Sequence, residues 1–131
     1  MILVDSSAFI EYYRPSGDPS VSAAVAEAIA LDSVAVNGVI QVELTAFVSR
    51  EADRARLAAD LQAFHWLELR HRDFDLAAQI GFDLRRKGIT IPATDLIIAA
   101  CAIGSGATLY HLDSHFDRIA RHADLSARHL A

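Results

Sequence analysis

The sequence predicts a single α/β domain with three layers, in which helices cover both faces of a mostly parallel sheet. Short apolar runs alternate with longer segments of helical periodicity, an order typical of parallel strands joined by helical crossovers. The segment from Leu96 to Ile103 is apolar on every side, as expected of a helix buried at the centre of a domain. Residues 1–131 are enough for one domain with a sizeable core, and they show no internal repeat or linker.

The N-terminal part of the chain predicts two strands and two helices. Met1 to Val4 is an apolar run that stops at Asp5, as a short buried strand would. Two serines follow and favour the start of a helix over residues 7–13. Apolar side chains at helical spacing predict a second helix over residues 20–31, and the apolar run at residues 33–36 predicts a second strand.

Asn37 marks the start of the most informative helix. Its side chain is a favoured helix N-cap, and an apolar helical pattern follows it as far as residue 49. Ile40, Leu44 and Phe47 lie at i, i+4 and i+7, which predicts the core face of this helix. A helix with largely solvated charges and a short third strand are expected next, at residues 50–64 and 66–69.

The C-terminal part predicts two long helices, a strand and a short last helix. An amphipathic pattern over residues 73–87 ends at Gly88, a typical helix stop, and the apolar helix described above follows it. Residues 108–112 predict the last strand, and residues 116–121 predict the short helix. The tail from His122 carries little signal, so no element is predicted there.

Composition excludes several classes of protein. Hydrophobic residues make up 53% of the chain and the mean hydropathy is +0.24, which excludes a disordered chain. The longest apolar run falls far short of the ~20 residues that cross a membrane, and the N-terminus has no basic segment typical of a signal peptide. Cys101 is the only cysteine, so no disulfide can form within the chain, and a cytoplasmic location is expected.

The net charge of −5 argues superficially against a nucleic-acid partner. If four of the 17 acidic residues bind a metal, however, 13 remain against 12 basic residues. Charge therefore neither supports nor excludes binding to nucleic acid.

Four carboxylates lie at unusual places in this pattern. Asp5 and Asp113 each directly follow a predicted strand, which places both at the carboxyl edge of a parallel sheet. Glu43 lies on the apolar face of its helix, and Asp95 opens the most buried helix. Taken singly, each has a structural alternative. The two acids that precede helices could be caps, Asp113 a turn residue, and Glu43 the partner of a buried arginine.

Taken together, the four acids favour a metal site. Two carboxylates about 4 Å apart repel by about 4 kcal/mol at an effective dielectric of about 20, so a converging quartet needs raised pKa values or a cation. Oxygen ligands without cysteine or clustered histidine suit Mg²⁺ or Mn²⁺ better than Zn²⁺. Such an ion activates water and stabilises a leaving oxygen, which suits phosphodiester hydrolysis.

The acids also stand in motifs that resemble those of PIN domains. These motifs are Asp5-Ser6-Ser7-Ala8 after the first strand, Gln41-Val42-Glu43-Leu44 in a helix, Thr94-Asp95-Leu96-Ile97, and Leu112-Asp113-Ser114-His115-Phe116. The resemblance covers essentially the whole chain. The length of the chain is similar to that of the VapC toxins of bacterial VapBC toxin–antitoxin pairs.

The resemblance implies a PIN-like fold and a Mg²⁺-dependent endoribonuclease, with Mn²⁺ as an alternative ion, inhibited by a cognate VapB-type antitoxin. The implied catalytic and metal-binding residues are Asp5, Glu43, Asp95 and Asp113. Ser7 would orient a carboxylate or the attacking water, and Thr94 would support the acid beside it. The implied reaction is in-line attack of water on an RNA phosphodiester, which leaves a 3′-hydroxyl and a 5′-phosphate. A homodimer is also expected by analogy.

The last motif departs from the family pattern. Many PIN domains carry Asp-x-Asp-Phe there, whereas this chain has His115 in place of the second acid. The histidine would weaken a second metal site or contact phosphate, and it joins Arg118 and Arg121 as a candidate RNA contact. On a continuing strand His111, Asp113 and His115 would share a face and suggest zinc. The strand is expected to stop near Asp113, so the histidines are predicted to be edge or rim residues.

Other functions compete with this hypothesis. One is a PIN-like binding module that has lost catalysis, for which His115 is the only support. Another is a DNA-directed, structure-specific nuclease, which would need a DNA-gripping insertion for which 131 residues leave little room. The basic run Arg85-Arg86-Lys87 is predicted to stabilise the end of its helix rather than to bind RNA.

Overall fold

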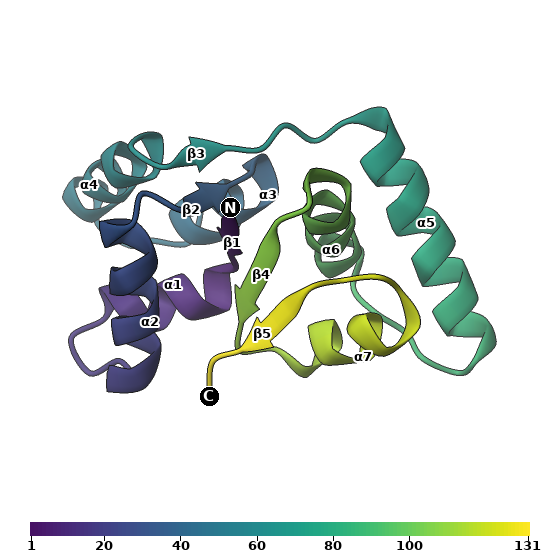
Figure 1. Ribbon diagram of the computed structural model, residues 1–131. Helices are drawn as coiled ribbons and strands as arrows, with labels where there is room; N and C mark the ends of the chain where they lie inside the picture. The colour runs from purple at the N-terminus through teal and green to yellow at the C-terminus, as the bar shows by residue number, and fades with distance from the viewer.

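Figure 1 shows a computed structural model of the protein, which describes all of residues 1–131. Seven helices surround a sheet of five short strands, in agreement with the predicted α/β class. In chain order the elements are β1 (Ile2–Val4), α1 (Ser6–Tyr13), α2 (Pro19–Ala30), β2 (Val34–Val36), α3 (Gly38–Thr45), α4 (Glu51–Gln62), β3 (His65–Trp66), α5 (His71–Arg86), α6 (Ala93–Ser105), β4 (Thr108–His111), α7 (Ser114–His122) and β5 (Ala127–His129).

The strands form one sheet in the order β3-β2-β1-β4-β5, and every neighbouring pair is parallel. The predicted parallel sheet is therefore confirmed, and it contains no antiparallel strand. β1 lies at the centre, where Leu3 pairs with Ala35 on one side and with Leu109 on the other. The pairing continues past the strand, because the backbone N–H of Asp5 donates to the carbonyl of Tyr110 at 2.9 Å. This bond holds the residue after β1 against β4.

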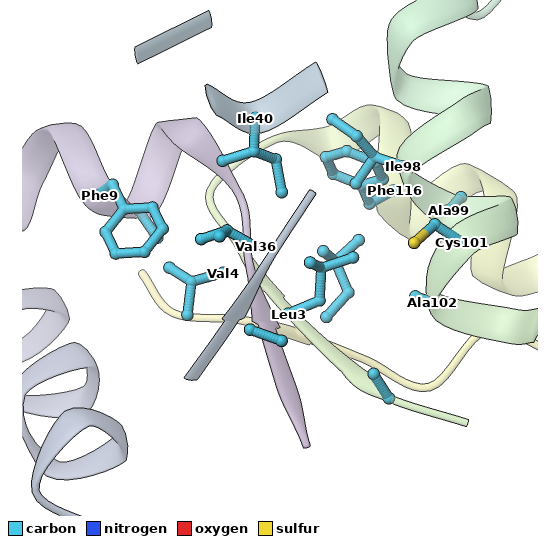
Figure 2. Close-up of a cluster of buried hydrophobic side chains, with 14 of the residues drawn as sticks. Leu3, Val4, Phe9, Val36, Ile40, Ile98, Ala99, Cys101, Ala102 and Phe116 are labelled. Carbon is cyan, nitrogen blue, oxygen red and sulfur yellow. The ribbon is translucent and has the colours of Figure 1, made fainter. Parts of the chain in front are cut away.

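Helices cover both faces of the sheet, which gives the three predicted layers (Figure 1). α1 packs against α2 on one side, and α5 packs against α6 on the other. Figure 2 shows the core between the layers, where Leu3 and Val36 from the strands meet Phe9 from α1 and Ile98 from α6. Because both faces are buried, β2 is apolar and buried at every position rather than alternating.

α6 is the buried central helix that the sequence predicted, with residues 98–102 all buried. It is longer than residues 96–103, however, because it already begins at Ala93. Asp95 consequently lies inside its first turn rather than before it. None of the seven helices combines the length and the apolar character that crossing a bilayer requires.

Two predicted helix ends are confirmed. Asn37 caps α3, since its Oδ1 accepts a hydrogen bond from the backbone N–H of Ile40 at 3.0 Å. Gly88 follows α5 with a φ of 81°, a conformation that is costly for residues with a side chain.

α3 is shorter than predicted, because it ends at Thr45 instead of residue 49. The hydroxyl of Thr45 donates back to the carbonyl of Gln41 at 2.7 Å, a local bond that competes with regular helix geometry. Phe47 therefore lies beyond the helix and is 85% exposed. The prediction that Phe47 belongs to the core face was wrong, although Ile40 and Leu44 are buried as expected.

The edge strands differ most from the prediction. Residues 127–129 form β5, which pairs with β4 although the tail carried little signal. β3 spans only two residues and lies one residue earlier than the strand predicted at 66–69. Edge strands this short are largely exposed here, so they show no run of buried side chains that a sequence pattern could detect.

Two phenylalanines test this assignment of the core. Phe9 is 0% exposed and stacks on Tyr13 and Phe64, whereas Phe47 projects into solvent. Phe9→Ala is expected to lower the free energy of unfolding by about 3–5 kcal/mol through the cavity it leaves. Phe47→Ala is expected to change it by less than about 0.5 kcal/mol. Urea denaturation measures both, and equal losses for the two variants would contradict the assignment.

Candidate functional site

The fold brings the four predicted acids to one edge of the sheet. Asp5 directly follows β1 and Asp113 lies just after β4. These neighbouring strands are parallel, so both acids lie at the same edge. Glu43 comes from α3 and Asp95 from the first turn of α6, and these two helices pack against each other.

Asp5 is 4% exposed and caps α1. Its Oδ2 accepts hydrogen bonds from the backbone N–H of Ser7 at 3.1 Å and from the Ser7 hydroxyl at 2.5 Å. The Ser7 oxygen in turn accepts the backbone N–H of Leu112 at 3.1 Å, which ties the first acid to the end of β4. Both capping bonds go to one carboxylate oxygen, so the roles of helix cap and metal ligand are compatible.

Glu43 is half-buried on α3, and its Oε1 accepts a hydrogen bond from the hydroxyl of Ser6 at 3.1 Å. It forms no salt bridge, so the alternative of a buried arginine partner is wrong. The pairing of Ser6 with Glu43 was not predicted, because the two residues lie 37 positions apart in the sequence.

His115 lies between two of the acids. Its Nδ1 is 2.8 Å from Oδ2 of Asp95 and 3.2 Å from Oδ1 of Asp113. The same Asp113 oxygen accepts the backbone N–H of His115 at 2.9 Å, which caps α7. A proton on Nδ1 is therefore shared by two carboxylates, and His115 stands where many PIN domains carry an acid.

Burial and mutual repulsion raise the pKa values of three of the acids. Desolvation is the largest cause for Asp5, Glu43 and Asp95. Repulsion between like charges raises these pKa values further. It acts between every two acids of the quartet that consists of these three and Asp113. Hydrogen bonds from the neighbouring serines and His115 oppose the rise without cancelling it.

This donor set fits a divalent cation. The ligand atoms of Asp95, Asp113 and His115 all lie within 4.8 Å of one another, and the remaining two acids repel them from the same edge. A cation would offset the repulsion that raises the pKa values. Carboxylate oxygens with a single imidazole nitrogen and no thiolate suit Mg²⁺ or Mn²⁺ better than a closed zinc site.

The other predicted site residues lie outside this cluster. Thr94 is exposed next to Asp95 and forms no hydrogen bond with the acids, so its supporting role stays a prediction. Arg118 and Arg121 are exposed on α7 and reach none of the four carboxylates.

His111 is 0% exposed, so the prediction that it is an edge or rim residue was wrong. Buried and partly exposed residues alternate along β4, and this alternation places His111 on the same inner face as Leu109. Its Nδ1 accepts the backbone N–H of Asp113 at 3.1 Å. Its proton is therefore on Nε2, and burial lowers the pKa of His111.

A second group of potential ligands consists of His111, Asp117 and His129. Nδ1 of His129 lies 2.7 Å from Asp117, which links β5 to α7. The His111 Nε2 that faces Asp117 at 3.7 Å carries the proton and cannot bind a metal in this state. The group is therefore structural, and Asp117 does not replace the acid missing at position 115.

A family model described as "PIN domain" matches residues 2–122 of the chain. The chain is 33% identical to the VapC ribonuclease Mb1587 of Mycobacterium bovis over 132 residues, which cover 97% of each protein. Ribonuclease VapC11 of Mycobacterium tuberculosis has the same identity and coverage.

Two solved structures illustrate the similarity of the fold. A chain of FitAcB from Neisseria gonorrhoeae superposes with a TM-score of 0.78 at 25% identity, over 97% of this chain and 96% of that one. A chain of VapBC2 from Rickettsia felis, bound to a DNA fragment from their promoter, has a TM-score of 0.78 at 19% identity over 98% of both chains. The second likeness shows the fold alone.

The raised pKa values predict how stability depends on pH in the metal-free protein. Each raised group binds its proton more tightly in the folded state, so the folded state loses stability as pH rises above the ordinary carboxylate range of about 4. Asp95→Asn removes one ionisable group and is expected to flatten this decline. Denaturant unfolding in EDTA between about pH 5 and 7 measures both proteins.

The difference between the two proteins isolates the contribution of Asp95, because ionisable groups that do not interact with it are common to both. The same slope in parent and variant would contradict the repulsion.

Proposed function

Because the chain belongs to the PIN-domain family and groups with the VapC ribonucleases, we propose that it is the toxin of a type II toxin–antitoxin pair and cleaves RNA as a Mg²⁺- or Mn²⁺-dependent endoribonuclease. The observation that carries the proposal is the convergence of four mutually repelling acids at one sheet edge. The four motifs of the sequence supply these acids in the order that the resemblance implies.

Asp5, Glu43, Asp95 and Asp113 would hold the divalent ion. When bound, the ion supplies charge neutralisation, activation of water and stabilisation of the leaving oxygen. In-line attack with departure of the 3′ oxygen leaves a 3′-hydroxyl and a 5′-phosphate. The chain's own contribution is to hold the carboxylates in place before substrate arrives.

The two serines after β1 perform most of this positioning. Ser7 orients Asp5 and is itself fixed by the backbone of Leu112, while Ser6 orients Glu43 across the gap to α3. Each hydroxyl thus connects an acid to a second element of the fold. These bonds limit the freedom of the carboxylates although like charges drive them apart.

His115 gains a role beyond the phosphate contact predicted from sequence. Its Nδ1 lies between Asp95 and Asp113, so the nitrogen would join these two acids as a ligand once its proton is lost. Imidazole is a better ligand for first-row transition ions than for Mg²⁺, which prefers oxygen. We therefore include Mn²⁺ preference in the proposal.

The proposed protein partner is a VapB-type antitoxin that inhibits the enzyme. Its support is that the solved structures with this fold include VapBC complexes from several bacteria. The homodimer predicted from the family resemblance stays a prediction.

A binding module without catalysis is the second candidate, and the placement of His115 favours it. A protonated imidazole between two carboxylates would neutralise part of the negative charge that a metal cation would otherwise neutralise. Titration calorimetry with Mn²⁺ separates the two candidates. If the protein is only a binding module, Asp95→Asn should not abolish any Mn²⁺ binding that the parent shows.

Asp5→Asn and Asp95→Asn each remove one proposed ligand and are expected to reduce RNA cleavage by at least about 100-fold. Cleavage of purified total RNA in Mn²⁺ measures the effect. Asp124→Asn is the matched control, because Asp124 is exposed and does not interact with Asp5, Glu43 or Asp95. Full activity of Asp5→Asn would refute the proposed site.

His115→Ala is expected to weaken Mn²⁺ binding more than Mg²⁺ binding, because it removes the only nitrogen ligand. Titration of both ions into parent and variant measures the two affinities. Tighter binding of both ions by the variant would show that His115 acts as a competing cation rather than as a ligand.

A further inference from the structure

A second polar site lies where α5 ends against α7. A pocket of about 190 Å³ opens there, between helices that are adjacent in Figure 1. It is lined by Leu84, Lys87, Ile89, Arg118, Arg121 and His122. Four of these six side chains are basic and none is acidic, although the protein as a whole carries a net charge of −5.

Three of the four basic side chains of this pocket have no carboxylate partner. Neither guanidinium, of Arg118 or of Arg121, forms a salt bridge, and Lys87 forms none. The Lys87 ammonium donates to Nδ1 of His122 at 3.1 Å, and Nε2 of His122 lies 3.6 Å from Asp83. This chain of contacts holds Lys87 at the pocket and leaves two of its three N–H donors for a ligand.

Stabilisation of helix ends does not account for this arrangement. Lys87, Arg121 and His122 do lie at helix C-termini, where positive charge is favourable. Arg118 lies in the middle of α7, however, and the ends of two different helices converge on one pocket. The three exposed cations repel one another only weakly through water, and an anion in the pocket would offset that repulsion.

Two elements of the fold connect the pocket to the acidic site. On α7, His115 contacts the acids and His122 lines the pocket, which is a separation of about 10 Å at 1.5 Å per residue. Arg118 lies one helical turn from His115 on the same side of the helix. The segment after α5 lines the pocket at Ile89 and reaches Asp95 in the first turn of α6.

We propose that this pocket binds a backbone phosphate of the RNA. This phosphate belongs to the cleaved strand and lies near the phosphodiester that is cleaved. The inference rests on the proposed function and names a site for its substrate. Guanidinium groups and an ammonium in a small pocket suit a phosphate, and contacts of this kind position a strand without reading its sequence. The pocket thus offsets the repulsion that the acidic site exerts on a polyanion. Lys87, predicted from sequence only to stabilise a helix end, becomes part of the substrate site.

The test measures binding of a fluorescent single-stranded RNA in EDTA at several salt concentrations, with no cleavage. Arg118→Gln/Arg121→Gln and Lys87→Gln are each expected to raise the Kd, by up to roughly fivefold for each charge removed. The slope of log Kd against log salt is expected to become less steep by about 0.7 when the phosphate contact is lost. The triple variant should lose less than the product of the separate effects, because all three groups hold one phosphate.

Two controls identify the pocket as the cause. Arg85→Gln removes the same charge from the end of α5 at a residue that does not line the pocket, and it should leave Kd unchanged. Arg118→Lys/Arg121→Lys keeps the charge and should keep the salt slope. Thermal unfolding of each variant confirms that the fold is intact.

Three outcomes would overturn the inference. The first is an unchanged Kd in the triple variant while the parent binds and cleaves RNA. It would exclude the pocket as a phosphate site and leave the proposed function intact. A poly-glutamate peptide that binds the parent more tightly than RNA does, and loses binding in the triple variant, would assign the pocket to an acidic protein segment. A parent that binds Mn²⁺ but neither binds nor cleaves RNA would refute the proposed function, and the pocket with it.

Discussion

The structure depends on keeping four carboxylates close together at the end of a parallel sheet. Every pair among them repels, and the burial of Asp5 and Asp95 removes water that would screen their charges. The fold resists this repulsion with its buried elements, since Asp5 follows the central strand and Asp95 lies in the first turn of the buried helix α6. The hydrophobic core in Figure 2 therefore supports a site that is electrostatically unfavourable without a cation.

Polar contacts at the site join elements that the core has already brought together. Ser6 bonds to α3 and Ser7 bonds to the end of β4, so two consecutive hydroxyls connect three elements. His115 adds the link between α6 and α7. Each of these contacts uses a short side chain at the start of a helix or a side chain in its first turn, where the backbone is well fixed. The site is consequently built on regular elements rather than on long loops.

The distribution of charge explains how an acidic protein can act on a polyanion. Negative charge gathers where a cation would offset it, and three cations without a salt bridge line the pocket between α5 and α7. α7 belongs to both regions, with His115 at its first turn and Arg121 at its last. The net charge of −5 combines these regions and hides the difference between them.

The α/β class, the Asn37 cap and the acids at the strand ends could be predicted from the sequence, because apolar runs, caps and strand ends are local patterns. The apolar pattern extended the helix after Asn37 to Phe47, whereas α3 ends at Thr45. β5 was missed because only its pairing with β4 creates it. Only the tertiary structure decided which distant side chains meet: Ser6 with Glu43 across 37 residues, and His115 with Asp95 across 20. No periodicity encodes such pairs, because their proximity results from how separate helices pack on the sheet.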